Sequence, residues 1–373
     1  MRVVVTGGGT GGHIYPAIAV AEELRRAGDD VLYVGATNGL EARVATDAGF
    51  PFVGVAARKI RKLVSPSTVS VLLALARGYR QASAHLMKFR PDVVIGTGGY
   101  VAAATGLAAA KRSIPLIIQA CDAIPGRTNR LLARRAWRIC IWFEETANFL
   151  PAGKTVVTGV PLREGAVSTE TQAAARQGLG LNPHAFTLTV LGGSQGARRL
   201  NQIVLDAVGL LAGDVQVLHQ TGEANLKDVQ NQAKAAGLDP SRYQPRAYLI
   251  GCEMARAYRA ADLVICRCGI ATLAELTVNG VAGLLVPLPT AYADHQTHNA
   301  LAVVRRGAGI LLREPELTGA QLAAQVRELQ RDTERLHQMA EAGRRAARPH
   351  AAATVAEIAR SAANRGSAST ASQ

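Results

Sequence analysis

A strand-like run that ends in a cluster of glycines, close to the start of the chain, constrains the fold more than any other feature. The β-branched residues Val3–Thr6 are followed by glycines at positions 7, 8, 9, 11 and 12, and then by His13. A helix is predicted from Pro16, because apolar residues recur at helical spacing up to Leu24 before Gly28. Glycine lets backbone approach a ligand, and a helix N-terminus offers free N–H groups to an anion. The sequence therefore predicts a phosphate- or sugar-binding loop with a titratable histidine at its mouth.

Three more junctions of this kind follow along the chain, each with a strand, a glycine-containing loop and a helix. They span residues 92–100, 187–197 and 263–272. Continuous apolar strands that alternate with helices indicate parallel sheets covered on both faces, with ligands beyond the carboxyl ends of the strands. The spacing in the first loop differs from the dinucleotide fingerprint G-x-G-x-x-G, which argues against a dehydrogenase.

The length of 373 residues suits two α/β domains rather than one core. Glycine loops open both halves, so we predict two Rossmann-like domains whose parallel sheets face each other across a cleft. The expected bounds are 1–160 for the N-terminal domain, 161–348 for the C-terminal domain, and 349–373 for a final helix and disordered tail. Gly159–Arg163 is the expected hinge, and Asn364–Gln373 the frayed end.

Composition limits the cellular compartment and the kinds of partner that the chain can have. No apolar run reaches the roughly 20 residues of a membrane span, and the immediate strand leaves no room for a signal peptide. Five cysteines without C-x-x-C spacing indicate reduced thiols in the cytoplasm, and Cys266 and Cys268 are read as strand-end packing rather than metal ligands. The net charge of +14 comes with only 4% aromatic residues and no nucleic-acid motif. An anionic substrate, an anionic membrane face or a basic solvated surface each remains consistent with that charge.

Five motifs, in order, resemble those of the MurG family of peptidoglycan glycosyltransferases. They lie at residues 8–13, 98–100, 192–198, 266–269 with Glu275, and 294–300. The resemblance implies the GT-B architecture and an inverting hexosyltransferase without cofactor or protein-bound metal. Such an enzyme moves N-acetylglucosamine from UDP-N-acetylglucosamine to the muramyl 4-hydroxyl of lipid I, a polyprenyl-diphosphate-linked muramyl peptide, and forms lipid II. It implies a peripheral protein on the cytoplasmic face of the membrane, with roles in cell wall biogenesis, cell shape and division.

The resemblance also implies where the sugar donor binds. Glu275 matches the carboxylate that holds the ribose hydroxyls, with a first-turn acid that favours the helix dipole as the alternative. Gln296 matches an amide that reads sugar hydroxyls, with an exposed glutamine as its alternative. The remaining donor-site residues are Arg163, Ser194, Gly251, Ile270, Ala271, Thr272, Leu273 and Ala274.

The acceptor is expected at the first glycine loop, at Thr10, Gly11 and Gly12, with His13 as the base for the acceptor hydroxyl. A histidine that merely caps the helix is the alternative. The chain departs from the family at Gln119–Cys121, where His-Glu-Gln usually stands, and retains Asp122. The missing histidine and glutamate leave His13 and Asp122 as the candidate catalytic residues.

A basic and apolar segment begins at Arg58. Arg58–Lys62 carries four cations and precedes Val69, Leu72, Leu73, Leu75 and Ala76, with Arg77, Arg80 and Lys88 beyond. Cations beside an apolar stripe are typical of a surface that meets anionic headgroups, and an ordinary core helix after a basic loop is the alternative.

Other functions remain open at this point. A related UDP-sugar transferase could act on a different lipid or natural-product acceptor, as the altered 119–121 segment allows. A non-catalytic lipid- or nucleotide-binding paralogue would keep the binding motifs without turnover. A UDP-sugar epimerase would share the fold, but the cleft carboxylates that its chemistry needs cannot be placed in the sequence.

Overall fold

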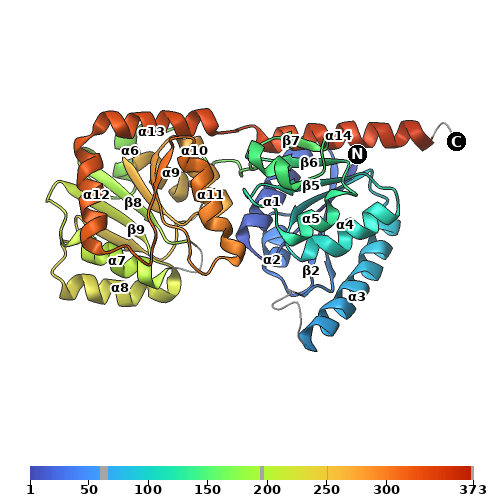
Figure 1. Ribbon diagram of the computed structural model, residues 1–373, viewed down its shortest axis with the longest axis horizontal. Coiled ribbons are helices and arrows are strands. Elements are labelled where there is room, and N and C mark those ends of the chain that lie inside the picture. The colour runs from blue at the N-terminus through green and yellow to red at the C-terminus, as the bar shows by residue number, and fades with distance from the viewer. Residues whose placement is uncertain (59–65, 194–196, 250, 371–373) are drawn as a thin grey trace. The chain divides into compact units, whose positions relative to one another are not determined.

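Each half of the chain forms its own parallel sheet in the computed structural model, which describes residues 1–58, 66–193, 197–249 and 251–370 (Figure 1). The first unit comprises Met1–Arg163 together with Arg348–Gln373, and the second comprises Glu164–Ala347. The prediction of two domains with parallel sheets is confirmed.

The first unit has a seven-stranded sheet with the order β3-β2-β1-β4-β5-β6-β7. Val5 of β1 lies opposite Tyr33 of β2 and Ile95 of β4, both in parallel register. The order of the strands reverses between β1 and β4, and the carboxyl ends at such a switch point are where ligands bind. The strands are β1 (Arg2–Gly7), β2 (Asp30–Ala36), β3 (Phe52–Val55), β4 (Val93–Gly98), β5 (Leu116–Ala120), β6 (Arg138–Ile141) and β7 (Thr155–Val157).

Helices cover both faces of this sheet. Val3 and Val5 pack into one core with α1, α2 and α14, whereas Val4 packs into another with α3, α4 and α5. Successive side chains of a strand point to opposite faces, so an unbroken valine run is what a sheet covered on both faces needs. The helices are α1 (Gly11–Arg26), α2 (Leu40–Asp47), α3 (Pro66–Phe89), α4 (Val101–Lys111), α5 (Arg127–Ala133), η1 (Glu144–Phe149) and α14 (Ala351–Thr370).

The second unit has a six-stranded parallel sheet with the order β10-β9-β8-β11-β12-β13. Its switch point lies between β8 and β11. The strands are β8 (Phe186–Leu191), β9 (Val215–Gln220), β10 (Tyr243–Arg246), β11 (Leu263–Cys266), β12 (Ala282–Leu285) and β13 (Gly309–Leu311). The helices are α6 (Gln172–Gly178), α7 (Arg198–Val208), α8 (Glu223–Ala235), α9 (Cys252–Ala260), α10 (Ile270–Asn279), η2 (Tyr292–Asp294), α11 (His295–Val304), α12 (Gly319–Arg331) and α13 (Thr333–Ala346).

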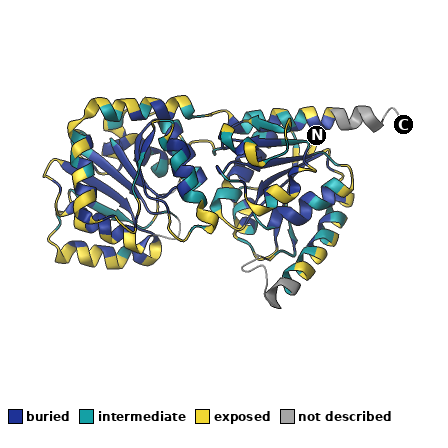
Figure 2. Cartoon of the chain, viewed as in Figure 1, coloured by how far each residue is buried: buried dark blue, intermediate teal, exposed yellow. Residues whose placement is uncertain are grey.

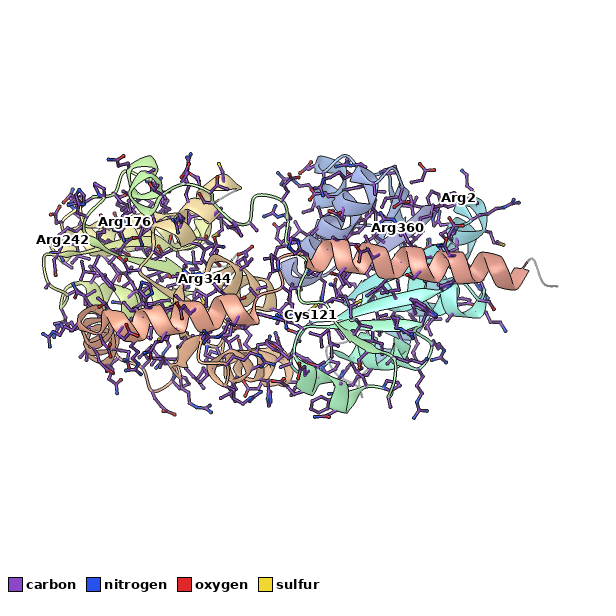
Figure 3. All side chains as sticks on the ribbon, turned by 90° about the horizontal axis from the view of Figure 1, so that it is seen from above. Arg2, Cys121, Arg176, Arg242, Arg344 and Arg360 are labelled. Carbon is purple, nitrogen blue, oxygen red and sulfur yellow. The ribbon has the colours of Figure 1, made fainter. Side chains whose placement is uncertain are left out.

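The strands of both sheets are buried, and the outer faces of the helices are exposed (Figure 2). In the second unit the buried Arg176, labelled in Figure 3, ties α6 to the start of β11. Its guanidinium pairs with Asp262 at 2.6 Å and donates to the carbonyl oxygen of Ala260 at 2.9 Å. Among the described residues no helix is long and apolar enough to cross a bilayer.

Helix α1 begins at Gly11, so the prediction of a start at Pro16 was wrong. The first turn forms on the carbonyl oxygen of Thr10, which accepts from the backbone N–H groups of His13 and Ile14 at 3.0 and 3.1 Å. Pro16 is the sixth residue of α1, where it removes the hydrogen bond to the carbonyl oxygen of Gly12, so a proline inside the helix does not mark its start. His13 therefore lies within the first turn of the helix and not in the loop before it.

The chain leaves the first unit and returns to it at neighbouring points. Gly159 has a φ of 86°, and a Cβ at this position would lie only 2.3 Å from the Cβ of Arg348. A side chain at residue 159 is thus excluded both by its backbone conformation and by the returning segment. Helix α14 then continues to Thr370, and residues 371–373 of the expected frayed end lie outside the described residues.

Candidate active site

His13 lies against the loop between β4 and α4 in the first unit. A Cβ at Gly98 would lie 2.9 Å from Nδ1 of His13, and one at Gly99 would lie 3.3 Å from its Cδ2. The hydroxyl of Thr97 donates to the carbonyl oxygen of His13 at 2.6 Å. The two glycine loops of this sheet therefore meet at the imidazole, which is half-buried. Thr10 is exposed and Gly11 and Gly12 are half-buried, so the predicted acceptor residues all retain exposed surface.

The segment that departs from the family pattern is mostly inaccessible. Gln119, Ala120 and Cys121 are buried at 2%, 1% and 8% exposure, whereas Asp122 is half-buried. Both amide atoms of Gln119 lack a hydrogen-bond partner among the described residues. Asn129 donates to the backbone oxygen of Gln119 at 2.9 Å and so fixes α5 to the end of β5. Of this segment, Asp122 alone presents a carboxylate to the surface.

Arg163 is the last residue of the first of the two segments that make up the first unit. Its side chain is exposed, and its guanidinium lies 4.4 Å from the centroid of the Tyr15 ring on α1. A cation over an aromatic face at this distance is a weak attractive contact at an exposed site. Arg163 is therefore held near the first turn of α1 while its charge stays in contact with solvent.

In the second unit the β11–α10 junction provides backbone donors and a carboxylate. Gly269 caps α10, and residues 270–274 form its first turn and the start of the next. The N–H groups at a helix start have no intrahelical partner and favour an anion. Glu275 is the sixth residue of α10, so the alternative of a first-turn acid is wrong. Its carboxylate accepts from the hydroxyl of the buried Tyr258 at 3.2 Å.

Burial, and second to it the carboxylate of Glu275, raise the pKa of Tyr258 well above its usual value. The phenol therefore remains a donor at any physiological pH. Its hydroxyl also lies 3.4 Å from the backbone oxygen of Thr272. Tyr258 on α9 thus fixes the orientation of the Glu275 carboxylate through a buried hydrogen bond.

Gln296 joins two loops at the carboxyl end of the second sheet. Its Oε1 accepts from the backbone N–H groups of Cys268 at 3.2 Å and Leu288 at 2.9 Å. Two backbone donors on one atom identify it as the oxygen. The side-chain NH₂ group is then the part of this amide that a ligand oxygen would meet.

Arg267 links the two loops that follow β11 and β12 through buried contacts. It is buried, forms an ion pair with the buried Glu314, and donates to the carbonyl oxygens of Val286 and Pro287 at 3.2 Å each. An unpaired buried charge is strongly unfavourable, so the ion pair and the two carbonyl bonds offset the burial of this guanidinium, although its Nε has no partner among the described residues. The ends of β11 and β12 are thereby held together.

Two predicted donor contacts are described only in part. Ser194 lies outside the described residues, and before it Gly193 has a φ of 83°. Gly251 is exposed and caps α9 with a φ of 58°, while residue 250 before it lies outside the described residues. Both glycines adopt a backbone conformation that favours glycine.

Sequence patterns missed several residues that shape these loops. Three of them form hydrogen bonds to residues that are distant in sequence: Thr97 to a residue 84 positions away, Asn129 to one 10 positions away, and Tyr258 to one 17 positions away. Glu41 is a fully buried acid on α2 that contacts the first glycine loop. An acid two residues after a glycine at a helix start is the one local signal that could have drawn attention to it.

Two parallel sheets, each with glycine-containing loops at its switch point and one with an acid in the second turn of a helix that starts there, provide groups that suit a nucleotide sugar. The model of the glycosyltransferase family 28 N-terminal domain matches residues 3–141, and that of the C-terminal domain matches residues 187–355. The chain belongs to the MurG family of these enzymes.

That membership follows from relatives that match over nearly the whole chain. A protein of Halothermothrix orenii named UDP-N-acetylglucosamine--N-acetylmuramyl-(pentapeptide) pyrophosphoryl-undecaprenol N-acetylglucosamine transferase is 40% identical over 366 residues, which cover 96% of this chain and 98% of that protein. The crystal structure of MurG from Acinetobacter baumannii is 29% identical with a TM-score of 0.79, covering 96% of this chain and 99% of that one. A UDP-N-acetylglucosamine 2-epimerase structure, 12% identical with a TM-score of 0.65 and covering 95% of this chain and 94% of that one, shares the fold alone.

Proposed function

We propose that the chain transfers N-acetylglucosamine from UDP-N-acetylglucosamine to the muramyl 4-hydroxyl of lipid I and so forms lipid II. The observation that carries the proposal is 40% identity over 96% of the chain to a transferase of that name. The presence of Glu275, Gln296 and the helix N-terminus of α10 at one switch point supports it, because these groups suit ribose, sugar and phosphate.

The donor would bind to the second unit. Glu275 would accept from the ribose hydroxyls, Gln296 would donate its NH₂ group to a sugar oxygen, and residues 270–274 would line the nucleotide with backbone. Gly251 would pass its backbone close to the uracil. Ser194 would contact the diphosphate, and Arg163, although it belongs to the first unit, is the guanidinium that we assign to the charge of departing UDP.

The acceptor would bind at residues 10–13 of the first unit, with Asp122 as a further contact. In the proposed step the acceptor 4-oxygen attacks the anomeric carbon as the bond from that carbon to the UDP oxygen breaks, and the configuration inverts. His13 takes the hydroxyl proton, and Asp122 is the next candidate base. Backbone N–H groups and arginine stabilise the negative charge on UDP.

The direct test is transfer of labelled N-acetylglucosamine to a lipid I analogue by the purified chain, with release of UDP in equal amount. Glycolipids without the muramyl peptide serve as competing acceptors in parallel reactions. Transfer to such a glycolipid and not to lipid I would support the alternative acceptor instead. Binding of both substrates without any UDP release would identify a binding protein and contradict the proposed transfer.

We further propose that α3 meets an anionic membrane face on the cytoplasmic side, where a lipid-linked acceptor and a water-soluble donor come together. Leu72 and Leu73 are 60% and 66% exposed, beside the exposed Arg77 and Arg80. Exposed leucines beside cations are typical of interfacial helices. Most of the basic segment before α3, Lys59–Lys62, lies outside the described residues.

Replacement of Arg77 and Arg80 by glutamine should weaken binding to vesicles that contain anionic lipid by about 1 kcal/mol per charge. Replacement of the exposed Lys227 and Lys234 on α8 removes the same charge elsewhere and serves as the control. Equal co-sedimentation of both double variants would show that the contact does not involve α3.

A further inference from the structure

Glu41 is a completely buried acid that contacts the backbone of the first glycine loop. It is the second residue of α2 and has 0% exposed surface. A buried carboxylate is costly unless several donors meet it, and the function proposed above assigns it no role. Its contacts therefore show what it does in this fold.

The two carboxylate oxygens join three parts of the first unit. Oε1 accepts from the backbone N–H of Ala36, at the end of β2, at 2.9 Å. Oε2 accepts from the backbone N–H of Gly9 at 3.3 Å. The start of α2, the end of β2 and the glycine loop are thus held by one side chain.

Three glycines make room for the Glu41 side chain, and one of them, Gly35, also makes room for the ring of Phe52, which would lie 2.6 Å from a Cβ there. A Cβ at Gly8 would lie 2.5 Å from Cδ of Glu41, one at Gly35 would lie 2.7 Å from its Cγ, and one at Gly39 would lie 2.3 Å from its Oε1. Real Cβ atoms do not approach other atoms so closely, so each position requires glycine while Glu41 is present. Part of the glycine cluster therefore serves the buried acid and not a ligand.

The buried carboxylate makes the two ends of the first glycine loop differ in their affinity for an anion. The N–H of Gly9 points inward to Glu41, and the negative charge below it opposes an anion at residues 8 and 9. The influence of that charge reaches further, because it adds to burial in raising the pKa values of Tyr33 and Tyr100. The backbone that can receive an anion begins at Gly11, where α1 starts.

We infer that Glu41 is a positioning residue for the acceptor site: it fixes the loop so that the diphosphate of the acceptor meets the backbone of residues 11 and 12 beside His13 and is kept away from residues 8 and 9. This inference rests on the proposed function, because it assigns the first loop to an anionic acceptor. Glu41 does not touch the substrate. Its effect passes through the backbone of Gly9 and the placement of the first turn of α1.

Glu41→Gln is the sharpest test, because it keeps the shape and removes the charge. Whichever way the amide turns, its NH₂ group faces a backbone N–H, so one of the two bonds is replaced by a contact between donors. We expect the KM for a lipid I analogue to rise about tenfold, the size of one lost charge-assisted hydrogen bond. The Kd for UDP-N-acetylglucosamine, measured by calorimetry, should stay within about twofold of its original value.

The matched control is Ala45→Gly, which weakens the same helix at a fully buried position without touching the carboxylate. It should lower the melting temperature and leave the acceptor KM unchanged. If Glu41→Gln leaves the acceptor KM unchanged, or if Ala45→Gly raises it in proportion to lost stability, Glu41 has only a structural role. Failure of the proposed function would look different, because then the unmodified chain itself would not transfer sugar to the lipid I analogue.

Discussion

His219 in β9 is a buried histidine whose surroundings hold it neutral. It has 0% exposed surface, and burial lowers its pKa from 6.5 to about 3. Its Nδ1 lies 2.7 Å from the Tyr243 hydroxyl, and its Nε2 lies 3.1 Å from Oδ1 of Asn201. The Asn201 amide nitrogen donates to a backbone carbonyl, so its Oδ1 accepts and Nε2 of His219 carries the proton. Both ring nitrogens are satisfied in the neutral form, with Nδ1 accepting from the tyrosine.

Acid should therefore destabilise the second unit through this one residue. The folded pKa lies below the unfolded value, so the unfolded chain binds the proton first. The contribution of His219 to stability is fully present above pH 6.5 and is lost as the pH falls toward about 3. Between pH 7 and pH 5 the loss is about 2 kcal/mol, because only the unfolded histidine becomes protonated in that range. His219→Gln should be less stable at pH 7 and should lack this part of the acid sensitivity.

Hydrogen exchange followed by mass spectrometry is the suitable assay. Both tryptophans, Trp137 and Trp142, lie in the first unit, so their fluorescence does not report on β9. Exchange of β9 peptides at pH 7 and pH 5, corrected for intrinsic rates, gives the opening free energy of the second unit. His184→Gln removes an exposed histidine of the same unit and should behave like the unmodified chain. The reasoning is refuted if His219→Gln loses as much opening free energy between the two pH values as the unmodified chain does.

Three further predictions concern the candidate site. Glu275→Ala should weaken UDP-N-acetylglucosamine binding by about 1–3 kcal/mol, and unchanged affinity in calorimetry would remove its ribose role. Tyr258→Phe should weaken the same binding by about 1 kcal/mol, because Glu275 loses its buried donor. Tyr243→Phe, another buried tyrosine of that unit, should leave the affinity unchanged, and equal effects of the two would point to lost stability instead. His13→Ala should lower turnover about 10²–10⁴-fold with donor affinity unchanged, and retention of more than a tenth of the turnover when chemistry limits the rate would exclude it as the base.

The fold could be predicted from the sequence because its signals are local. Unbroken apolar strands followed by glycines marked the four strand–helix junctions, which the structure places at β1–α1, β4–α4, β8–α7 and β11–α10. Residues 194–196 of the third junction lie outside the described residues. The pattern predicts the start of α1 too late, because a proline is typical of a first helical position, whereas the turn before Pro16 already closes on Thr10.

The supporting contacts of the site could not be predicted in the same way. The Tyr258–Glu275 and Glu41–Gly9 hydrogen bonds join separate elements, and no local pattern reports which buried polar groups meet. Glu275 was correctly placed on a helix, but its place in the second turn depended on where α10 begins. Glycine spacing alone also could not separate glycines that face a ligand from those that make room for Glu41.

Helix α14 has a consequence for how the chain acquires its structure during synthesis. Val355, Ala356, Ala359 and Ala362 are buried against residues of β1 and α1, more than 300 positions earlier in the chain. The second unit is continuous in sequence and has all of its residues before α14 is made. The first unit, although it begins the chain, must wait with part of its apolar surface uncovered until its last helix leaves the ribosome. Its final packing step therefore comes after synthesis of the whole second unit, when an early sheet closes on a late helix.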